Sequence, residues 1–281
     1  KIVSIVFENG EVPASFQPNL NTETAIIFRV PLLAQGGNQN IVLTNIEGKT
    51  LSVPFEVLLP PAISSVFPTD FQAGSTLTIT GNNLADVTDV VISGTTDAAT
   101  IVSKTLTQLV VTMPASEVNT GKIAITNLAG TTTTEQVVVN VDKALQVFSD
   151  DLMNGFQSWS WGGTYEPSTD VAISGPKSMK AAFDPSGTWG GLQLGNNGSI
   201  NIADYKYFTF WIKGADVEKK FQYWINWGNQ KQIVVPANVW TYYKYDLMSE
   251  FPGVTDVNNV TFQIYDEGHT VYFDNIIFYK D

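Results

Sequence analysis

The sequence predicts an all-β protein, and three observations support this class. Short hydrophobic stretches alternate with polar residues and are rich in β-branched side chains, as at residues 76–80, 108–112 and 122–126. Turn-forming residues, such as Gly-Asn-Asn at 81–83, separate the stretches. No helical repeat of hydrophobic residues continues for more than a turn or two. Because period-two alternation puts the apolar side chains on one face, we expect these stretches to be half-buried strands.

Composition and charge limit the number of domains and the kinds of partner. The 281 residues are too many for one ordinary sandwich and suit two or three domains. The net charge is −12, from 15 basic and 27 acidic residues, which argues against nucleic acid as a partner because phosphate binding needs clustered Lys and Arg. Only 15 % of the residues are charged, so Thr, Asn, Gln, Ser and Gly must supply the polar surface. That surface favours neutral, hydroxyl-rich ligands.

Residue types that are missing from the sequence narrow the chemistry further. The sequence has no cysteine and one histidine, His269, which excludes cysteine-based catalysis, disulfides and zinc clusters. No apolar run is long enough to span a membrane, and no signal-peptide pattern begins at Lys1.

An internal repeat organises the first half of the chain. Residues 109–114 and 124–130 are echoed earlier by residues 25–31 and 42–48. The offset is 83 residues between the two matching prolines and 82 between the two matching asparagines. This length is typical of one immunoglobulin-like domain, so we expect two such β-sandwiches in tandem.

The second copy carries two motifs that resemble a known family. Residues 60–68 read Pro-Pro-Ala-Ile-Ser-Ser-Val-Phe-Pro, and residues 74–84 read Gly-Ser-Thr-Leu-Thr-Ile-Thr-Gly-Asn-Asn-Leu. The segment resembles the IPT/TIG family, which implies a complete immunoglobulin-like domain at residues 60–142 that serves as a spacer. The repeat offset places the first copy's equivalent of Gly81 before the first residue of the chain. We therefore expect residues 1–59 to form a partial domain of the same type, in a fragment of a longer protein.

The composition changes abruptly near residue 144. All seven tryptophans follow this point, namely Trp159, Trp161, Trp189, Trp211, Trp224, Trp227 and Trp240. Strand-like stretches are expected at residues 177–183, 189–194, 207–213, 221–227, 240–247, 260–265 and 270–278. Strands of this number and length match the size of a jelly-roll sandwich.

Two short motifs in this last segment also resemble known domains. Residues 271–278 read Val-Tyr-Phe-Asp-Asn-Ile-Ile-Phe, and residues 148–151 read Phe-Ser-Asp-Asp. They resemble the last and first strands of jelly-roll carbohydrate-binding modules of the galactose-binding-like type. This resemblance implies that residues 143–281 form a jelly-roll carbohydrate-binding domain.

Tandem IPT/TIG-like units followed by such a sandwich resemble the surface glycan-binding proteins of Sus-type polysaccharide-utilisation systems. The resemblance implies a non-catalytic, monomeric protein that captures a polysaccharide for a surface transporter complex. It also implies an outer-membrane lipoprotein at the bacterial cell surface, with the anchor region outside this chain.

Strand parity predicts a binding face in the last domain. Where Phe208, Phe210 and Ile212 point into the core, Trp211 points outward, and the same argument applies to the other strands. The ligand-binding residues expected from parity and resemblance are Trp161, Trp189, Gln193, Trp211, Gln222, Trp224, Asn226, Gln263 and Tyr265. Indoles stack on the C–H face of a sugar, and amides pair with its hydroxyls. An open, uncharged aromatic face favours a neutral β-linked chain, so we expect a β-glucan.

For every tryptophan of this segment there is an alternative to ligand binding, because a tryptophan in a β-sandwich lies more often in the hydrophobic core than on a ligand-binding surface. Trp240 is assigned to the core or to the second sheet, and Trp159 and Trp227 are left open. A one-residue bulge would invert the assignment on any single strand.

The same resemblance implies a structural calcium ion held by Asp274 with Asp150 or Asp151, and no other cofactor. The alternative is that Asp274 accepts hydrogen bonds from nearby backbone amides.

Two other function classes use similar parts. A glycoside hydrolase needs two carboxylates across a cleft, but Glu166, Asp184, Asp266 and Glu267 lie near predicted strand ends and form no recognisable pair. His269 is isolated, and the sequence has no Gly-x-Ser-x-Gly nucleophile motif. We therefore expect no enzyme activity. An adhesin that recognises a host glycan or a protein stays open as the second alternative.

Overall fold

A computed structural model describes residues 1–22, 24–187 and 189–281. Helical residues in this part of the chain are confined to three short segments, η1 (Pro18–Leu20), η2 (Val141–Lys143) and α1 (Leu247–Glu250). The all-β class predicted from the sequence is therefore confirmed. No helix among the described residues is long and apolar enough to cross a membrane.

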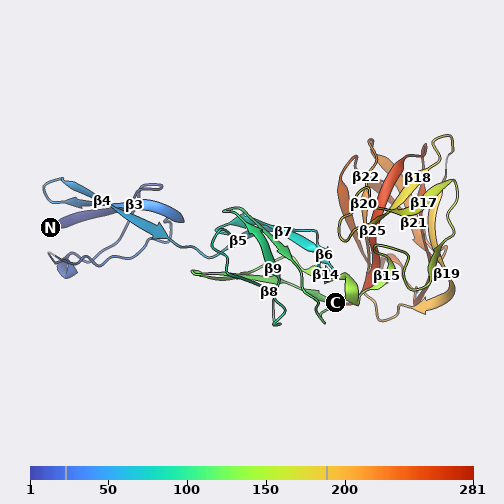
Figure 1. Ribbon diagram of the computed structural model, residues 1–281, viewed down its shortest axis with the longest axis horizontal. Coiled ribbons are helices and arrows are strands. Elements are labelled where there is room, and N and C mark those ends of the chain that lie inside the picture. Colours follow the sequence, from blue (N-terminus) through green and yellow to red (C-terminus); the bar gives the residue numbers. More distant parts are fainter. Residues whose placement is uncertain (23, 188) are drawn as a thin grey trace.

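Three β-rich units follow one another along the long axis of the molecule (Figure 1). We call them the first unit (residues 1–59), the middle unit (residues 60–142) and the C-terminal sandwich (residues 143–281). The C-terminus returns to the boundary between the middle unit and the sandwich (Figure 1).

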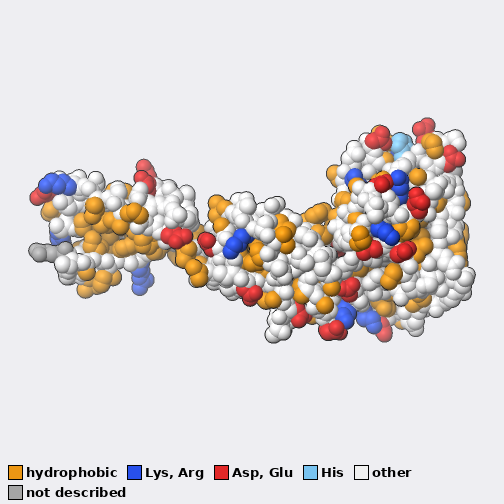
Figure 2. All heavy atoms as spheres, in the orientation of Figure 1, with side chains coloured by type: hydrophobic (Ala, Val, Ile, Leu, Met, Phe, Trp, Pro, Cys, Tyr) orange, Lys and Arg blue, Asp and Glu red, His pale blue; other side chains and the backbone are white. Residues whose placement is uncertain are grey.

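The first unit is built on one antiparallel sheet. Its order is β2-β1-β3-β4, with β1 (Ile2–Phe7), β2 (Val12–Pro13), β3 (Gly37–Asn45) and β4 (Thr50–Val57). Ile5, Phe7 and Ile41 are buried on one face. On the same face Val53 pairs with Ile41 yet is 38 % exposed, and Leu51 is 60 % exposed. The described residues place no second sheet over this side, and hydrophobic side chains gather on the surface of the unit (Figure 2).

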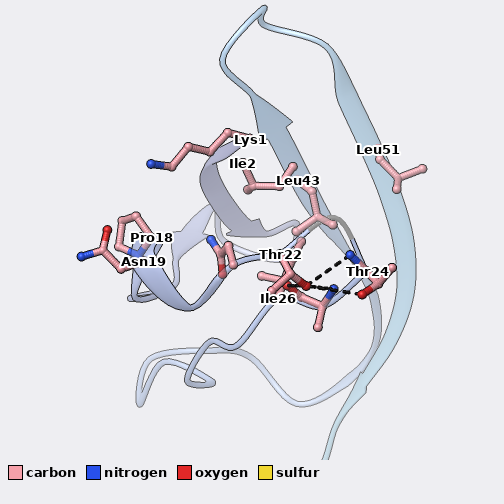
Figure 3. A pocket seen from close by; sticks show the side chains of 11 residues that line it. Lys1, Ile2, Pro18, Asn19, Thr22, Thr24, Ile26, Leu43 and Leu51 are labelled. Carbon is pink, nitrogen blue, oxygen red and sulfur yellow. Dashed lines mark hydrogen bonds between the residues drawn. The ribbon is translucent and has the colours of Figure 1, made fainter.

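A cavity of about 950 Å³ opens beside this uncovered face (Figure 3). Leu43 and Leu51 of the sheet line it, together with Pro18 and Asn19 of η1 and with Thr22 and Ile26 of the following loop. Thr22 Oγ1 accepts a hydrogen bond from the backbone N–H of Ala25 at 2.9 Å, which closes the loop locally. None of the seven tryptophans lines the cavity. We interpret it as space left by a half-covered sheet.

The repeat seen in the sequence corresponds to a repeated turn. Asn45 ends β3, and its Oδ1 accepts hydrogen bonds from two backbone N–H groups at 3.0 and 2.8 Å. Asn127 ends β12 (Ile123–Asn127), and its Oδ1 accepts two such bonds at 2.9 and 3.2 Å. Nδ2 of Asn127 also donates to the carbonyl of Leu59 at 2.8 Å, which fastens the middle unit to the end of the first.

The middle unit is a sandwich of short sheets. One side has the order β5-β7-β10-β9, with β5 (Ala62–Phe67), β7 (Thr76–Asn82), β10 (Gln108–Thr112) and β9 (Thr100–Lys104). The other side has β13 (Gly130–Thr133), β12 and β8 (Asp89–Ile92), and β11 (Thr120–Gly121), β14 (Val138–Asn140) and β6 (Asp70–Phe71). Gly81 of the sequence motif lies against the carbonyl of Ala62, and a Cβ there would collide with it.

The C-terminal sandwich consists of two antiparallel sheets. The first, which we call the joint sheet, has the order β17-β18-β25-β20-β23, with β15 beside β25: β15 (Leu145–Phe148), β17 (Gly163–Ser168), β18 (Ser178–Phe183), β20 (Tyr207–Lys213), β23 (Trp240–Asp246) and β25 (Thr270–Tyr279). The second, the platform sheet, has the order β16-β19-β24-β21-β22: β16 (Phe156–Ser158), β19 (Gly191–Asn201), β21 (Lys219–Ile225), β22 (Lys231–Val235) and β24 (Asp256–Ile264). The core between the sheets is largely aromatic and includes Phe208, Phe210, Tyr223, Phe262, Phe273 and Phe278.

The outer face of the joint sheet is partly covered by the middle unit. Trp211 points outward from β20, as parity predicts, but it is only 3 % exposed. Its Nε1 donates a hydrogen bond to Oδ2 of the fully buried Asp70 at 2.7 Å, and its ring meets Phe67 edge-on with centroids 5.6 Å apart. The prediction that Trp211 contacts a ligand is therefore corrected, because another domain occupies its face. We call this contact the joint.

Further contacts extend the joint on both sides of Trp211. Gln72 Nε2 donates to Asp150 Oδ2 at 3.1 Å, and Ser149 Oγ donates to Gln72 Oε1 at 3.2 Å. A small apolar cluster across the joint consists of Val139, Val141, Ile277 and Tyr279. Two polar links and an apolar cluster around one buried indole are expected to hold the two domains in one orientation.

Buried carboxyls give the joint a pH dependence. Burial raises the pKa of Asp70 from 3.8 to about 7, opposed by the hydrogen bond from Trp211. Burial likewise raises the pKa of Asp274, and the negative charges of Asp70 and Asp150 raise it further, to about 8. Since both folded pKa values lie above the unfolded value, this contribution to stability is complete below about pH 4 and is lost as pH rises through 7 to 8.

We therefore expect the melting temperature to fall between about pH 5 and pH 9, and Asp70→Asn to flatten that fall. Asparagine stays neutral, and its side-chain oxygen still accepts the bond from Trp211. Differential scanning calorimetry across this pH range measures the effect, with the exposed Asp89→Asn as the matched control. A melting temperature in Asp70→Asn that falls as steeply as in the wild type would contradict the assignment.

We also expect Trp211→Ala to uncouple the domains. Removing a buried indole costs about 3–5 kcal/mol in well-packed sites, and it also leaves Asp70 without its donor. Calorimetry should then resolve separate transitions for the middle unit and the sandwich, and small-angle scattering should show a wider range of shapes. Trp240→Ala is the control, since Trp240 lies half-buried on the joint sheet outside these contacts. Unchanged unfolding of Trp211→Ala would show that the joint is not a coupling element.

Candidate functional site

The outer face of the platform sheet gathers most of the residues predicted to bind a ligand. Strand register aligns Gln193 with Thr261 and Thr261 with Trp224, so these three side chains form one row across β19, β24 and β21. The next row across the sheet consists of Gly191, Gln263, Gln222 and Gln232. Because inward and outward side chains alternate, all of these residues face away from the aromatic core.

Two indole rings lie over glycines of β19. After β16 the chain continues beside β19, where the backbone N–H of Trp159 donates to the carbonyl of Gln193 at 2.8 Å. The ring of Trp159 lies over Gly195, and the ring of Trp161 lies over Gly191. A Cβ at either glycine would occupy the space of the ring. Glycine is therefore required at both outward positions, on either side of Gln193.

A third indole stands at the end of this edge. Trp189 is 44 % exposed, and its ring centroid lies 4.9 Å from that of Tyr265. Its backbone has φ of 67°, a left-handed conformation that costs a non-glycine residue roughly 1 kcal/mol. Its carbonyl accepts two hydrogen bonds, from Trp161 Nε1 at 2.7 Å and from Gln263 Nε2 at 3.0 Å. These bonds fix the backbone that presents the ring.

The amides of the second row are joined in a network. Gln222 Nε2 donates to Gln263 Oε1, and Tyr265 Oη donates to Gln222 Oε1 at 3.0 Å. Gln232 Nε2 donates to Tyr265 Oη at 2.7 Å. Since each group holds its neighbour, the network presents its remaining donors and acceptors in fixed positions.

The opposite side of the face carries two indoles in contact, with their ring planes tilted by 37°. Trp224 is 2 % exposed and lies under Trp227, which is 64 % exposed, with ring centroids 5.5 Å apart. Asn226, predicted as a ligand contact, has its side chain engaged with the backbone of β24. Its Nδ2 donates to the carbonyl of Asp256 at 2.7 Å, and its Oδ1 accepts from the N–H of Asn258 at 2.8 Å. Asn226 therefore supports the turn that carries Trp227.

The structure brings together most of the predicted set and adds to it. Trp161, Trp189, Gln193, Gln222, Trp224, Gln263 and Tyr265 lie on this face, whereas Trp211 lies in the joint. Trp159 and Trp227, whose location the sequence did not decide, border the face. Gln232 also lies on it, although the sequence did not predict it as a binding residue. The Gly-Leu-Gln-Leu-Gly run at 191–195 was the available signal, since outward glycines in a strand mark a close approach.

The face has the chemistry of a mostly uncharged platform, with the exposed Lys220 as the charged residue that alternation along β21 turns to the same side. Its other named members are tryptophans, one tyrosine, one threonine and glutamines, none of which carries a charge. Exposed indoles offer flat apolar surface, and amides offer paired donors and acceptors. Two of the four carboxylates considered for hydrolysis lie away from this face: Glu166 is on β17 of the joint sheet, and Asp184 accepts from Ser186 Oγ at 2.8 Å in a loop. Asp266 and Glu267 follow Tyr265 in the loop after β24. His269 lies 3.1 Å from Asp216.

The predicted calcium ligands lie next to the joint. Asp274 accepts backbone hydrogen bonds from Ile173 and Asn275, both at 2.9 Å, which is the amide-capping alternative. Asp150 accepts from the N–H of Lys177 at 2.9 Å as well as from Gln72. The described residues contain no group of three or more His, Cys, Asp or Glu side chains placed to hold a metal. Calcium prefers six to eight oxygen ligands, so these two carboxylates do not fit it by themselves, and calcium binding stays a prediction.

The middle unit is similar in sequence to a known domain family. Residues 61–150 match the IPT/TIG domain family, which confirms the resemblance of residues 60–142. No curated protein sequence matches the chain.

Solved structures are similar to the chain over its whole length. SGBP-B from a complex xyloglucan utilization locus in Bacteroides uniformis covers 100 % of this chain over 92 % of its own, with 18 % identity and a TM-score of 0.53. A crystal structure with a xylogluco-oligosaccharide covers 100 % of this chain over 74 % of its own, with 15 % identity and a TM-score of 0.52. At these identities the likeness establishes the fold. It confirms the fold that the resemblance to surface glycan-binding proteins implied.

Proposed function

We propose that the C-terminal sandwich binds a neutral polysaccharide on the outer face of the platform sheet, without catalysis. The observation that carries this proposal is the pair of indoles seated on Gly195 and Gly191, on either side of Gln193. Because β19 has glycine at both positions under the rings, the two indoles can lie flat on the strand and present their outer faces to a ligand. Sugars meet such a surface with their C–H faces, while their hydroxyls pair with nearby amides.

The class of sugar follows from charge and shape. The residues proposed to contact the glycan are neutral, and Lys220 is the one named charge on this face, which favours a neutral glycan over a densely sulfated chain. Indoles spread over a sheet, without an enclosed pocket, suit an extended β-linked chain that crosses the strands. We expect a β-glucan, and xyloglucan is the first polysaccharide to test, because one protein of this fold comes from a xyloglucan utilization locus and another was crystallised with a xylogluco-oligosaccharide.

The remaining parts of the proposal concern location. Proteins of similar fold are surface glycan-binding proteins, which supports a place at the bacterial cell surface as an outer-membrane lipoprotein beside a glycan transporter. In such a place the joint would set the direction in which the platform faces, and the first and middle units would set its distance from the surface.

We expect the whole chain to be retarded in native affinity electrophoresis by xyloglucan or another β-glucan, and not by starch. The physical reason is that an extended chain contacts several indoles together, whereas a coiled α-linked chain follows a different curvature. Isothermal titration with the matching oligosaccharide gives the affinity. Retardation by none of xyloglucan, mixed-linkage β-glucan, mannan and starch would contradict the proposed function, and binding only to a host glycan or a protein would favour an adhesin.

We expect Trp161→Ala and Gly195→Ala each to weaken binding about ten-fold or more, which corresponds to about 1.4 kcal/mol. The first substitution removes a stacking ring, and the second displaces the ring of Trp159 with a Cβ. Trp240→Ala is the matched control on the other sheet, and circular dichroism reports folding. Equal affinity in Trp161→Ala and the wild type would place the binding face elsewhere.

A further inference from the structure

Two donors on the platform face have no partner among the described residues. They are Nε2 of Gln193 and Nε1 of Trp224, and both atoms are buried. Their side chains are 5 % and 2 % exposed. They lie in one row, on either side of the fully buried Thr261. Buried N–H groups in proteins nearly always have a hydrogen-bond partner, so two unpaired N–H donors (orphans, below) in one row are unusual.

The neighbouring row shows that the sheet is able to satisfy its amides. Gln222, Gln263, Gln232 and Tyr265 are joined by hydrogen bonds to one another. An unpaired buried donor loses its bonds to water and regains nothing, whereas an apolar side chain of the same shape has no such penalty. Gln193 and Trp224 therefore destabilise the free protein relative to apolar alternatives. A ligand that supplies an acceptor would remove this penalty.

The side chains above these donors lie at the margins of the sheet. Gln193 is flanked by the indoles of Trp159 and Trp161, which rest on the glycines at either side of it. Trp224 lies under Trp227, which stands in the turn between β21 and β22 with φ of 58°. Trp159 is 40 % exposed and Trp227 is 64 % exposed, so one face of each ring is open to solvent.

We propose that the row Gln193–Thr261–Trp224 is a subsite that receives an oxygen atom of the glycan beneath the plane of the outer indoles. This inference rests on the proposed function and names the atoms that read the sugar. Both orphans are neutral N–H donors, so the subsite selects an acceptor oxygen that projects from a pyranose ring toward the sheet, such as a hydroxyl. Displacement of Trp227 or Trp159 from its resting position admits the sugar. A site built to bond a hydroxyl rejects an analogue that lacks it, so this row confers specificity where the indoles confer affinity.

The test uses Gln193→Met in the whole chain, with a xylogluco-oligosaccharide and cellohexaose as probes. Methionine has nearly the same length as glutamine and no donor. We expect the melting temperature to rise by about 2–4 °C because the orphan is removed. We expect the affinity for the bound probe to fall about five- to ten-fold because the sugar loses its partner. Trp224→Phe, which removes the indole N–H, should also lower the affinity while circular dichroism shows a folded sandwich.

The matched control is Gln146→Met, which makes the same change at a glutamine whose donor is paired. Gln146 Nε2 donates to the carbonyl of Val141 at 2.8 Å near the joint, so this variant should melt lower and bind the probes as the wild type does. If Gln193→Met and Trp224→Phe both bind as tightly as the wild type, the subsite is refuted while the proposed function stands. Loss of both stability and affinity in Gln193→Met would make Gln193 a supporting residue and would also refute the subsite. A wild type that binds neither probe nor any other polysaccharide overturns the proposed function, and the subsite with it.

Discussion

The hydrogen bond from Trp211 to Asp70 decides which face of the C-terminal sandwich is available to a ligand. The sandwich has two sheets and one core, so each sheet presents one outer face. The indole of Trp211, with Phe67 against its edge, seals the joint sheet against the middle unit. The middle unit does not cover the platform sheet, so the tryptophans at the border of that sheet stay accessible to solvent. The middle unit is therefore part of the architecture of the binding face, although none of its residues lies on that face.

Several unfavourable local features lie around the platform, although others lie elsewhere in the described residues, including around the joint. Trp189, Asn226 and Trp227 are non-glycine residues with positive φ, and all three lie at the margins of the platform. Two buried donors on its floor have no partner among the described residues. Strained backbone and unpaired polar groups persist where the surrounding structure compensates for them, and they cluster at functional sites. Here the compensation comes from the aromatic core beneath the sheet and from the hydrogen bonds that fix Trp189 and Asn226.

The first and middle units show how one sequence repeat yields one recurrent turn in two settings. Asn45 and Asn127 each fold a hairpin end by accepting two backbone amides. In the middle unit a second sheet then closes the sandwich, whereas the first unit leaves Leu51 and Val53 exposed on the face that such a sheet would cover. The same local signal therefore forms the same turn, while burial depends on strands contributed from elsewhere in the chain.

The sequence by itself determined the all-β class, the repeat and the direction in which most side chains of the last domain point. Residues 207–213 were predicted as a strand with the bounds that β20 has, and parity correctly turned Trp211, Trp224 and Gln193 away from the core. These properties are local, because alternation and turn chemistry act between near neighbours along the chain. Only the tertiary structure decided what covers each outward face. Trp211 and Trp224 both point outward from a strand, but Trp211 meets another domain and Trp224 lies beside Trp227. That difference arises from the contact of Trp211 with Asp70, a residue far away in sequence, which no periodicity encodes.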